Sequence, residues 1–300
     1  MDQVRIDLNL VRCLVDKQFP QWAELPIRPV ATSGWDNRTF HLGKDMLVRM
    51  PSAECYAAQV EKEHRWLPRL APHLPLPIPA PLAVGEPGFD YPWRWSIYRW
   101  LKGETVASSP IKDMKSFATT LGQFLAALQR ISTEGGPQAG VHNFYRGGSL
   151  KVYDEQTCEA IAKLQGKIDS AVVTELWDAA LTSTWQGSPV WVHGDVSIGN
   201  LLVQNGQLSA VIDFGVLGIG DPACDLVIAW TFFRSESREA FKAALPLDAA
   251  TWARARGWAL WKSLFVAARL PGANPAEVES SWQTLNEVIA DHKANTVLET

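Results

Sequence analysis

The sequence contains few cysteines, and their spacing does not indicate a metal or redox site. Four cysteines occur among 300 residues, far apart from one another, and no Cys-x-x-Cys pair is present. A disulfide framework or a zinc site would need cysteines at closer, paired spacings. We therefore expect buried, reduced thiols at Cys13, Cys55, Cys158 and Cys224, and a reducing, cytoplasmic location.

Long apolar runs and a surplus of positive charge are also lacking. Residues 1–5 contain no apolar stretch of the secretory type, and runs such as Leu226 to Phe233 are far too short to cross a bilayer. Lysine and arginine total 28 against 32 aspartates and glutamates, which gives a net charge of -4. Neither nucleic acid nor a membrane is therefore expected as a partner, and the oligomeric state stays open.

Motifs of several other enzyme classes are missing. No G-x-x-x-x-G-K-[ST] segment occurs, which excludes a P-loop enzyme, and no H-E-x-x-H segment indicates a metalloprotease. Ser197 lies near His193, but the G-x-S-x-G spacing of a hydrolase nucleophile is absent. A metal-dependent hydrolase stays an alternative, although two-metal hydrolases usually gather more His and Asp ligands than this loop supplies.

The first third of the chain is rich in strand-like segments. Two short β-type runs, Thr39 to Leu42 and Met46 to Met50, are joined by a turn, and Trp95 to Leu101 is a further strand-like run. Between them, Glu54 to Leu70 has helical spacing. Prolines crowd residues 72–92, where we expect rigid turns rather than a long helix.

The rest of the chain is mostly helical in pattern. A β-rich island at 190–212 interrupts the helical spacing, and Asn205-Gly206 within it is typical of a hairpin turn. A small β-rich lobe joined near Leu101 to a larger helical lobe is the simplest architecture for such a pattern. Helices are expected within 117–128, 155–184, 222–233, 252–270 and 275–293, besides an N-terminal helix that starts near Leu8.

One segment contains side chains suited to phosphoryl transfer. This reaction needs a carboxylate that orients the attacking hydroxyl, and oxygen ligands that hold Mg²⁺ against the phosphates. Asp195 and Asn200 lie on one loop of the β-rich island. Asp213 ends the next strand, where a hairpin returns it to the same edge. The three side chains are therefore expected to converge.

The combination H-G-D-x-x-x-x-N, a hairpin and D-F-G resembles the aminoglycoside phosphotransferase family, relatives of the protein kinases, over nearly the whole chain. The resemblance implies an α+β, bilobal, protein-kinase-like fold. A small β-rich N-lobe, 1–101, would bind the nucleotide. A larger, mainly helical C-lobe, 102–300, would contain the catalytic loop, the Mg²⁺ site and the acceptor site. By the same resemblance Asp195 is the catalytic base, and Asn200 and Asp213 hold Mg²⁺.

The loop also has an expected support. In the segment G-D-P-A-C-D-L the second aspartate, Asp225, is interpreted as a structural brace for the catalytic loop. Asp221, the first aspartate of the same segment, is interpreted as structural too. We assign His193 to loop support rather than proton transfer.

The N-lobe contains residues that match a nucleotide site. Gly34 and Asn37, within Ser33 to Asn37, fall at places that match the family's nucleotide-positioning loop, where backbone N–H groups approach phosphate. Arg49 stands where the kinase pattern has a strand lysine that grips the phosphates, and arginine does not replace lysine freely. Its expected ion-pair partner is Glu63.

The segment Ile97 to Gly103 resembles the strand that links the two lobes of such enzymes. The backbone of Arg99 and Leu101 is then expected to hydrogen-bond the purine edge of the nucleotide. Tyr98 would be the gatekeeper behind the base, and its bulk favours GTP over ATP as a hypothesis.

The sequence thus predicts transfer of the γ-phosphate of ATP or GTP, with Mg²⁺, to a hydroxyl of a small molecule. An aminoglycoside or macrolide antibiotic is the leading acceptor, and a metabolite such as choline, an amino alcohol or a sugar is the alternative. A catalytically inactive, nucleotide-binding regulatory module is a further possibility. No motif identifies the acceptor, and Trp252, Trp258 and Trp261 are predicted to pack in the core rather than to wall an acceptor site.

Overall fold

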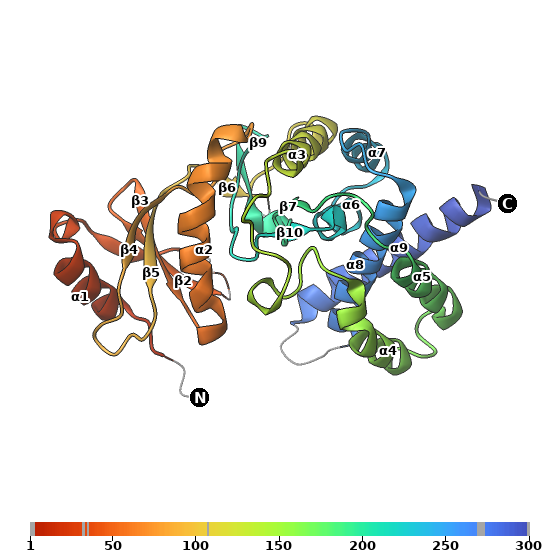
Figure 1. Cartoon of the computed structure of the whole chain (residues 1–300), viewed down its shortest axis with the longest axis horizontal. Coiled ribbons are helices and arrows are strands. Elements are labelled where there is room, and N and C mark those ends of the chain that lie inside the picture. Colours follow the sequence, from red (N-terminus) through yellow and green to blue (C-terminus); the bar gives the residue numbers. More distant parts are fainter. Residues whose placement is uncertain (1–3, 32–33, 35, 107, 269–273, 299–300) are drawn as a thin grey trace.

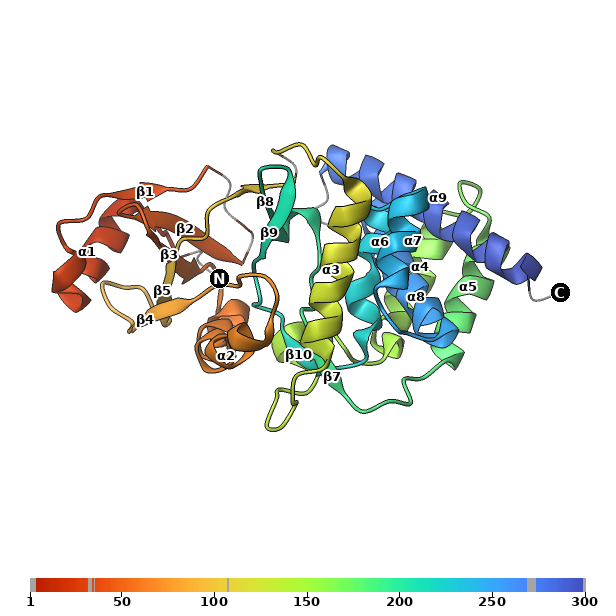
Figure 2. The ribbon, with the colours of Figure 1, turned by 90° about the horizontal axis from the view of Figure 1, so that it is seen from above.

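The computed structural model describes residues 4–31, 34, 36–106, 108–268 and 274–298. A small lobe with a β-sheet and a larger helical lobe lie side by side along the long axis of the molecule (Figures 1 and 2). This is the bilobal α+β arrangement expected from the sequence pattern.

The small lobe is built on an antiparallel five-stranded sheet of order β1-β2-β3-β5-β4. Helix α1 (Leu8–Gln18) packs on one face, where Leu14 and Val15 join a hydrophobic cluster with Val48 and Ile97 of the sheet. Helix α2 (Glu54–Leu70) lies on the other face, toward the larger lobe (Figure 1). The strands are β1 (Ile27–Pro29), β2 (Asn37–Leu42), β3 (Met46–Pro51), β4 (Pro81–Gly85) and β5 (Trp95–Arg99).

Strand β4 was not expected within the proline-rich stretch 72–92. It lies at the edge of the sheet and pairs only with β5. Proline is tolerated at the first position of an edge strand, because no neighbour requires its missing N–H. Pro81 is that first residue, and the register shifts between Pro81 and Ala83.

The larger lobe is mainly helical and is organised around α8. This helix packs against α9, α5 and α4, and residues on all its sides are buried, which weakens its amphipathic pattern. The helices are α3 (Met114–Gln129), α4 (Asp154–Lys163), α5 (Ser170–Thr182), α6 (Ile228–Thr231), α7 (Ser235–Ala243), α8 (Ala249–Ala267) and α9 (Pro275–Leu298).

Short strands of the larger lobe frame the catalytic segment. Strand β8 (Leu201–Gln204) pairs with β9 (Gln207–Val211) around the expected hairpin, and β6 (Glu104–Thr105) pairs with β8. Strand β7 (Val190–Val192) pairs instead with β10 (Gly218–Gly220), which the sequence pattern did not predict. Strand β10 has only three residues, two of which are glycines, and such a segment gives no strand signal in the sequence.

The lobe boundary at residues 101 and 102 stays a prediction. The hydrophobic cluster of the larger lobe includes Trp66 and Leu70 of α2, together with Leu121 of α3. The face of α2 that turns away from the sheet therefore shares its core with the second lobe.

The four cysteines are free thiols. The expectation of burial is wrong for Cys13, Cys55 and Cys158, which are exposed, and only Cys224 is buried. A small cysteine side chain can lie on the exposed surface of a helix at little cost. The number and spacing of the cysteines therefore did not predict whether each one is buried. Among the described helices, none combines the length and the apolar character that a bilayer crossing requires.

Candidate active site

A cavity of about 590 Å³ lies between the sheet of the small lobe and the β8–β9 hairpin of the larger lobe. Its lining combines the loop before β2, the end of β5 and the segment after β7, which are far apart in sequence. Every predicted site residue except Glu63 lines it: Gly34, Asn37, Arg49, Tyr98, Arg99, Leu101, Asp195, Asn200 and Asp213.

Asp195 and Asn200 are joined within one loop. The Asn200 amide Nδ2 donates to the Asp195 backbone oxygen at 2.9 Å and to its Oδ2 at 3.1 Å. Gly194 has a φ of 86°, and a Cβ there would lie 2.6 Å from the Val216 carbonyl oxygen. Only glycine fits that position, so the sharp turn that presents Asp195 depends on it.

Two buried side chains hold this turn in place. The Asp225 carboxylate accepts from the backbone N–H groups of His193 and Gly194, both at 2.7 Å. Burial raises the pKa of Asp225, and these N–H donors oppose that rise by favouring its charged form. His193 places Nε2 3.0 Å from the Ile212 backbone oxygen and Nδ1 3.2 Å from the Asp195 N–H. The geometry agrees with the supporting roles expected for Asp225 and His193.

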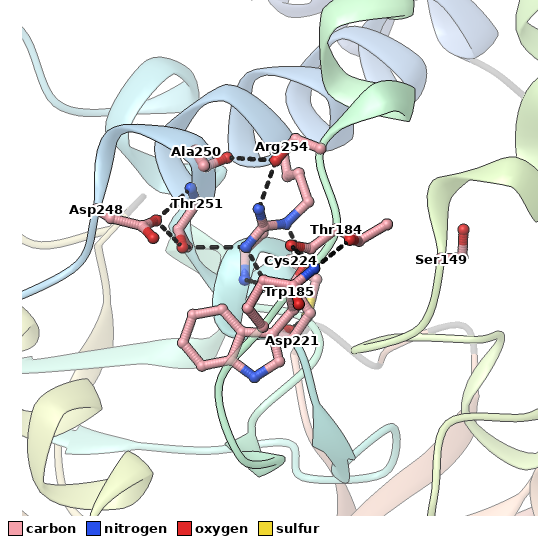
Figure 3. A network of polar contacts seen from close by, with 12 residues as sticks. Ser149, Thr184, Trp185, Asp221, Cys224, Asp248, Ala250, Thr251 and Arg254 are labelled. Carbon is pink, nitrogen blue, oxygen red and sulfur yellow. Dashed lines mark hydrogen bonds and ion pairs between the residues drawn. The ribbon is translucent and has the colours of Figure 1, made fainter.

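A buried ion pair anchors the segment that contains Asp225 (Figure 3). Arg254 of α8 donates to the Asp221 carboxylate at 2.6 and 3.3 Å. Its remaining N–H groups reach Thr251 Oγ1 at 3.0 Å and Ser183 Oγ at 2.7 Å. Both charged side chains are at most 10% exposed. This geometry agrees with the structural role expected for Asp221. Its partner Arg254 was not predicted, because a charged residue on a helix normally lies on the solvent-exposed face.

Breaking this pair should destabilise the protein strongly. In Arg254→Met the Asp221 carboxylate stays buried without its cation, which costs about 3–5 kcal/mol of unfolding free energy. Chemical denaturation measures the loss. The double variant Asp221→Leu/Arg254→Met should recover much of it, and Arg5→Met, which removes a pair whose arginine is 89% exposed, should change little. An Arg254→Met protein as stable as the wild type would contradict this role.

Asp213 lies beyond the end of β9 in a strained backbone conformation. Its φ is 67°, in the left-handed region, which aspartate tolerates better than most residues. Arg49 Nη2 donates to Asp213 Oδ1 at 2.7 Å. A carboxylate after β9 is thereby linked to a cation on β3 across the cavity.

Arg49 also makes the ion pair expected with Glu63, at 3.2 Å. Burial alone would lower the pKa of Arg49, but Glu63 and Asp213 outweigh it and raise that pKa above its ordinary value. Glu63 is 3% exposed and lies behind the cavity wall, where it also accepts a hydrogen bond from the Tyr98 hydroxyl. Glu63 therefore fixes Arg49 and Tyr98 and does not itself face the cavity.

In the segment after β5, the backbone N–H of Leu101 is available to a ligand. Arg99 N–H donates to the Ala80 oxygen at 2.9 Å, and Trp100 N–H donates to the Asp45 oxygen at 2.8 Å. Among the described residues no backbone or side-chain acceptor takes the Leu101 N–H. Of the two residues expected to meet a purine edge, Leu101 can donate through its N–H. Arg99 can act only through its carbonyl, because its N–H is already engaged.

The loop before β2 is described only in part. Ser33 and Trp35, which belong to the expected nucleotide-positioning loop, lie outside the described residues. Gly34 is exposed and lines the cavity, whereas Asn37 is buried at the start of β2. Asp36 lines the cavity as well and accepts from Gln59 Nε2 at 3.1 Å.

The donor set at this end of the cavity fits Mg²⁺. Burial raises the pKa of Asp36, and the charges of Asp213 and Asp195 add to that effect, while Gln59 and Arg49 oppose it. Three carboxylates, those of Asp36, Asp195 and Asp213, line the cavity. The Nδ2 bonds of Asn200 leave its Oδ1 as an acceptor. No three His, Cys, Asp or Glu side chains cluster as a metal cage in the described part of the chain. Magnesium bound through nucleotide phosphates needs only one or two protein ligands.

Sequence reasoning missed a second group of residues next to Asp195. Lys262 Nζ of α8 lies 3.2 Å from Asp195 Oδ1. Burial is the largest influence on the pKa of Asp195 and would raise it, but Lys262, His193 and Arg146 together outweigh burial and hold that pKa below its ordinary value. Trp252, Trp258 and Trp261 are buried in the hydrophobic core, as predicted, and Trp258 and Trp261 also line a smaller cavity here with Arg146. Helical spacing alone cannot tell a core tryptophan from a cavity wall.

Solved structures with the same fold are phosphotransferases. The wild-type aminoglycoside 2'-phosphotransferase-IIIa in its GDP complex superposes with a TM-score of 0.72 at 18% identity, over 95% of this chain and 99% of that chain. Macrolide 2'-phosphotransferase MphH from Brachybacterium faecium, an apoenzyme, gives 0.60 at 22% identity, over 93% and 98%. These likenesses confirm the kinase-like fold predicted from the sequence.

One curated relative and one family model match the sequence itself. The uncharacterized protein YcbJ of Bacillus subtilis (strain 168) is 24% identical over 165 residues, which is 54% of this chain and 51% of that protein. The chain therefore matches about half the length of that relative. The model of the phosphotransferase enzyme family, APH, matches residues 27–258, a span that includes the five-stranded sheet of the small lobe and the catalytic loop. The chain belongs to the phosphotransferase enzyme family.

Proposed function

We propose that the protein transfers the γ-phosphate of ATP or GTP to a hydroxyl of a small molecule. The observation that supports this most is that Asp195, Asn200 and Asp213 line one cavity together with Leu101, whose backbone N–H has no acceptor among the described residues. A cavity of about 590 Å³ has room for a nucleotide. Similar folds include complexes with GDP and with ATP.

In the proposed reaction the acceptor hydroxyl oxygen attacks the γ-phosphorus. The new O–P bond forms as the bond to the β-phosphate oxygen breaks, and the nucleoside diphosphate leaves with that electron pair. Asp195 orients the hydroxyl and accepts its proton. Asn200 and Asp213 would hold Mg²⁺, which neutralises phosphate charge when bound. Arg49, released from Asp213 or shared with it, is placed to contact the phosphates.

The nucleotide preference follows from Tyr98. This side chain is 1% exposed, and its hydroxyl bond to Glu63 fixes the ring beside the purine position. We expect GTP to be used better than ATP, because the ring narrows the inner pocket. Tyr98→Met should raise the ATP-to-GTP ratio of kcat/KM by about 10-fold or more, whereas Tyr98→Phe, which keeps the ring, should not. Initial rates with both nucleotides test this, and a strong ATP preference of the wild type would defeat it.

The proposed acceptor belongs to one of two chemical classes. Antibiotic acceptors, aminoglycosides or macrolides, are the first expectation, since such enzymes share the fold. A small metabolite with a hydroxyl is the alternative. The inactive regulatory module is disfavoured by the presence and mutual contact of Asp195 and Asn200. We also propose a cytoplasmic location, where ATP and GTP are available.

A nucleotide-consumption screen tests the proposed function. Purified protein is incubated with Mg²⁺, ATP or GTP, and a panel of antibiotics, sugars, amino alcohols and hydroxy acids, and the phosphorylated product is identified by mass. We expect at least one acceptor to gain one phosphate. Failure of the protein to bind either nucleotide in the presence of Mg²⁺ would overturn the proposal.

A further inference from the structure

A small cavity adjoins the nucleotide cavity at Asp195, which lines both. Its other walls come from the larger lobe: α8, the loop before α4, the catalytic loop and the segment after β10. We infer that a group bound there would lie on the acceptor side of the catalytic carboxylate. Its volume of about 20 Å³ suits one small end group of a ligand rather than a whole antibiotic.

The charges around this cavity are mainly positive. Arg146 and Lys262 line it, and Asp195 is its only acidic lining residue. Lys262 already pairs with Asp195 at 3.2 Å. Throughout the described ranges no carboxylate lies within ion-pair distance of Arg146, whose one side-chain hydrogen bond reaches the Tyr153 hydroxyl at 3.5 Å. Among the described residues, Arg146 therefore has no direct ion-pair partner, although the Asp195 carboxylate lines the same cavity.

Aromatic rings and the catalytic loop hold this cation in place. The Arg146 guanidinium lies over the rings of Trp258 and Trp261, at 5.2 and 4.9 Å from their centroids. Trp261 stacks on Tyr153 at 3.9 Å and donates its indole N–H to Gln156 at 2.6 Å. The Arg146 Cβ packs against the turn at Gly194. Rings that stack on a guanidinium leave its in-plane N–H groups available for a bidentate anion.

A further donor in the same wall lacks an acceptor. The Trp258 side chain is 2% exposed, and its indole N–H has no hydrogen-bond partner among the described residues. Buried donors are usually satisfied, so this indole N–H is a polar group that the described residues leave unsatisfied next to the cavity. The charged side chains of the lining are two cations, Arg146 and Lys262, and one carboxylate, Asp195.

We propose that the acceptor carries a carboxylate, or a similar small anionic group, which Arg146 binds while the acceptor hydroxyl lies against Asp195. This inference rests on the proposed phosphotransfer function and names the acceptor class: a hydroxy acid. A polycationic aminoglycoside would meet Arg146 and Lys262 with like charge and is a poor fit for this wall. The metabolite alternative is favoured over the aminoglycoside.

The test compares acceptors that differ only in charge. Glycerate and 3-hydroxybutyrate are each assayed beside the corresponding amide and amine, with kanamycin as the polycation. We expect the acids to exceed their amides by about 10- to 100-fold in kcat/KM, the range of one charged hydrogen-bonded contact. Arg146→Gln should remove that preference by acting on the acids, and Arg69→Gln, an arginine over Trp66 remote from the cavity, should keep it.

If the enzyme phosphorylates these probes only slowly, their binding affinities can be compared instead. Calorimetry on protein loaded with Mg²⁺ and a non-hydrolysable nucleotide should show acids bound at least about 10-fold more tightly than amides, and only with Arg146 intact. Equal binding of acid, amide and amine overturns the proposal, as does equal loss of acid and amide turnover in Arg146→Gln. An equal loss of acid and amide turnover would mean that Arg146 contacts the transferred phosphate and not the acceptor. Phosphorylation of amines or kanamycin alone would overturn the carboxylate and leave phosphotransfer standing.

Discussion

Replacing Asp195 with asparagine should lower phosphotransfer turnover by about 10²- to 10⁴-fold, the range of a positioned acid–base group. Asparagine keeps the size of the side chain and can still bond Asn200, so the loop should retain its shape. It cannot accept the proton of the attacking hydroxyl. Nucleotide binding should stay near the wild-type level, because the base and phosphates of the nucleotide are held by other residues.

Two measurements separate this effect from general damage. Turnover under saturating nucleotide gives the loss in the chemical step, and equilibrium nucleotide binding gives the integrity of the cavity. Asp178→Asn, at an exposed position on α5, serves as a matched control and should match the wild type in both. An Asp195→Asn enzyme with nearly normal turnover would remove Asp195 from the role of base.

Replacing Asp213 with asparagine should act on the metal-bound nucleotide instead. The change removes the negative charge that we propose binds Mg²⁺, and it weakens the 2.7 Å contact with Arg49. Loss of one preorganised charge contact of this kind typically costs about 10²- to 10³-fold in kcat. The protein should also lose most of the gain in nucleotide affinity that Mg²⁺ gives the wild type.

The decisive comparison is nucleotide binding with and without Mg²⁺ in both proteins. In the wild type Mg²⁺ should tighten binding, and in Asp213→Asn the two curves should nearly coincide. Asp45→Asn, at an exposed position in the turn between β2 and β3 of the small lobe, should behave like the wild type. If Asp213→Asn kept the full response to Mg²⁺, the metal would be held elsewhere.

The nucleotide side of the site was predictable because its residues lie in short local patterns. Asp195, Asn200 and Asp213 occupy one loop and the end of one hairpin, so spacing and turn chemistry bring them together. The bounds of α2 coincide with the predicted range, and its Glu63 makes the expected pair with Arg49. Local sequence thus determines local geometry here.

The acceptor side was not predictable for the opposite reason. Lys262 is 67 residues from Asp195 in the chain, and only the packing of α8 brings them into contact. Because α8 is buried on all sides, its hydrophobic pattern does not mark one face as exposed. The pattern therefore cannot show that Trp258 lines a cavity. Strand β10 is too short, and β4 too rich in proline, to be recognised before their partner strands are known.

A crystal structure with Mg²⁺ and a non-hydrolysable GTP analogue tests the central claim most directly. We expect one Mg²⁺ between the phosphates and the side-chain oxygens of Asn200 and Asp213, at about 2.0–2.1 Å, with the γ-phosphate facing Asp195. The purine should meet the backbone of Leu101. A nucleotide bound outside this cavity, or a metal that touches neither Asn200 nor Asp213, would contradict the account.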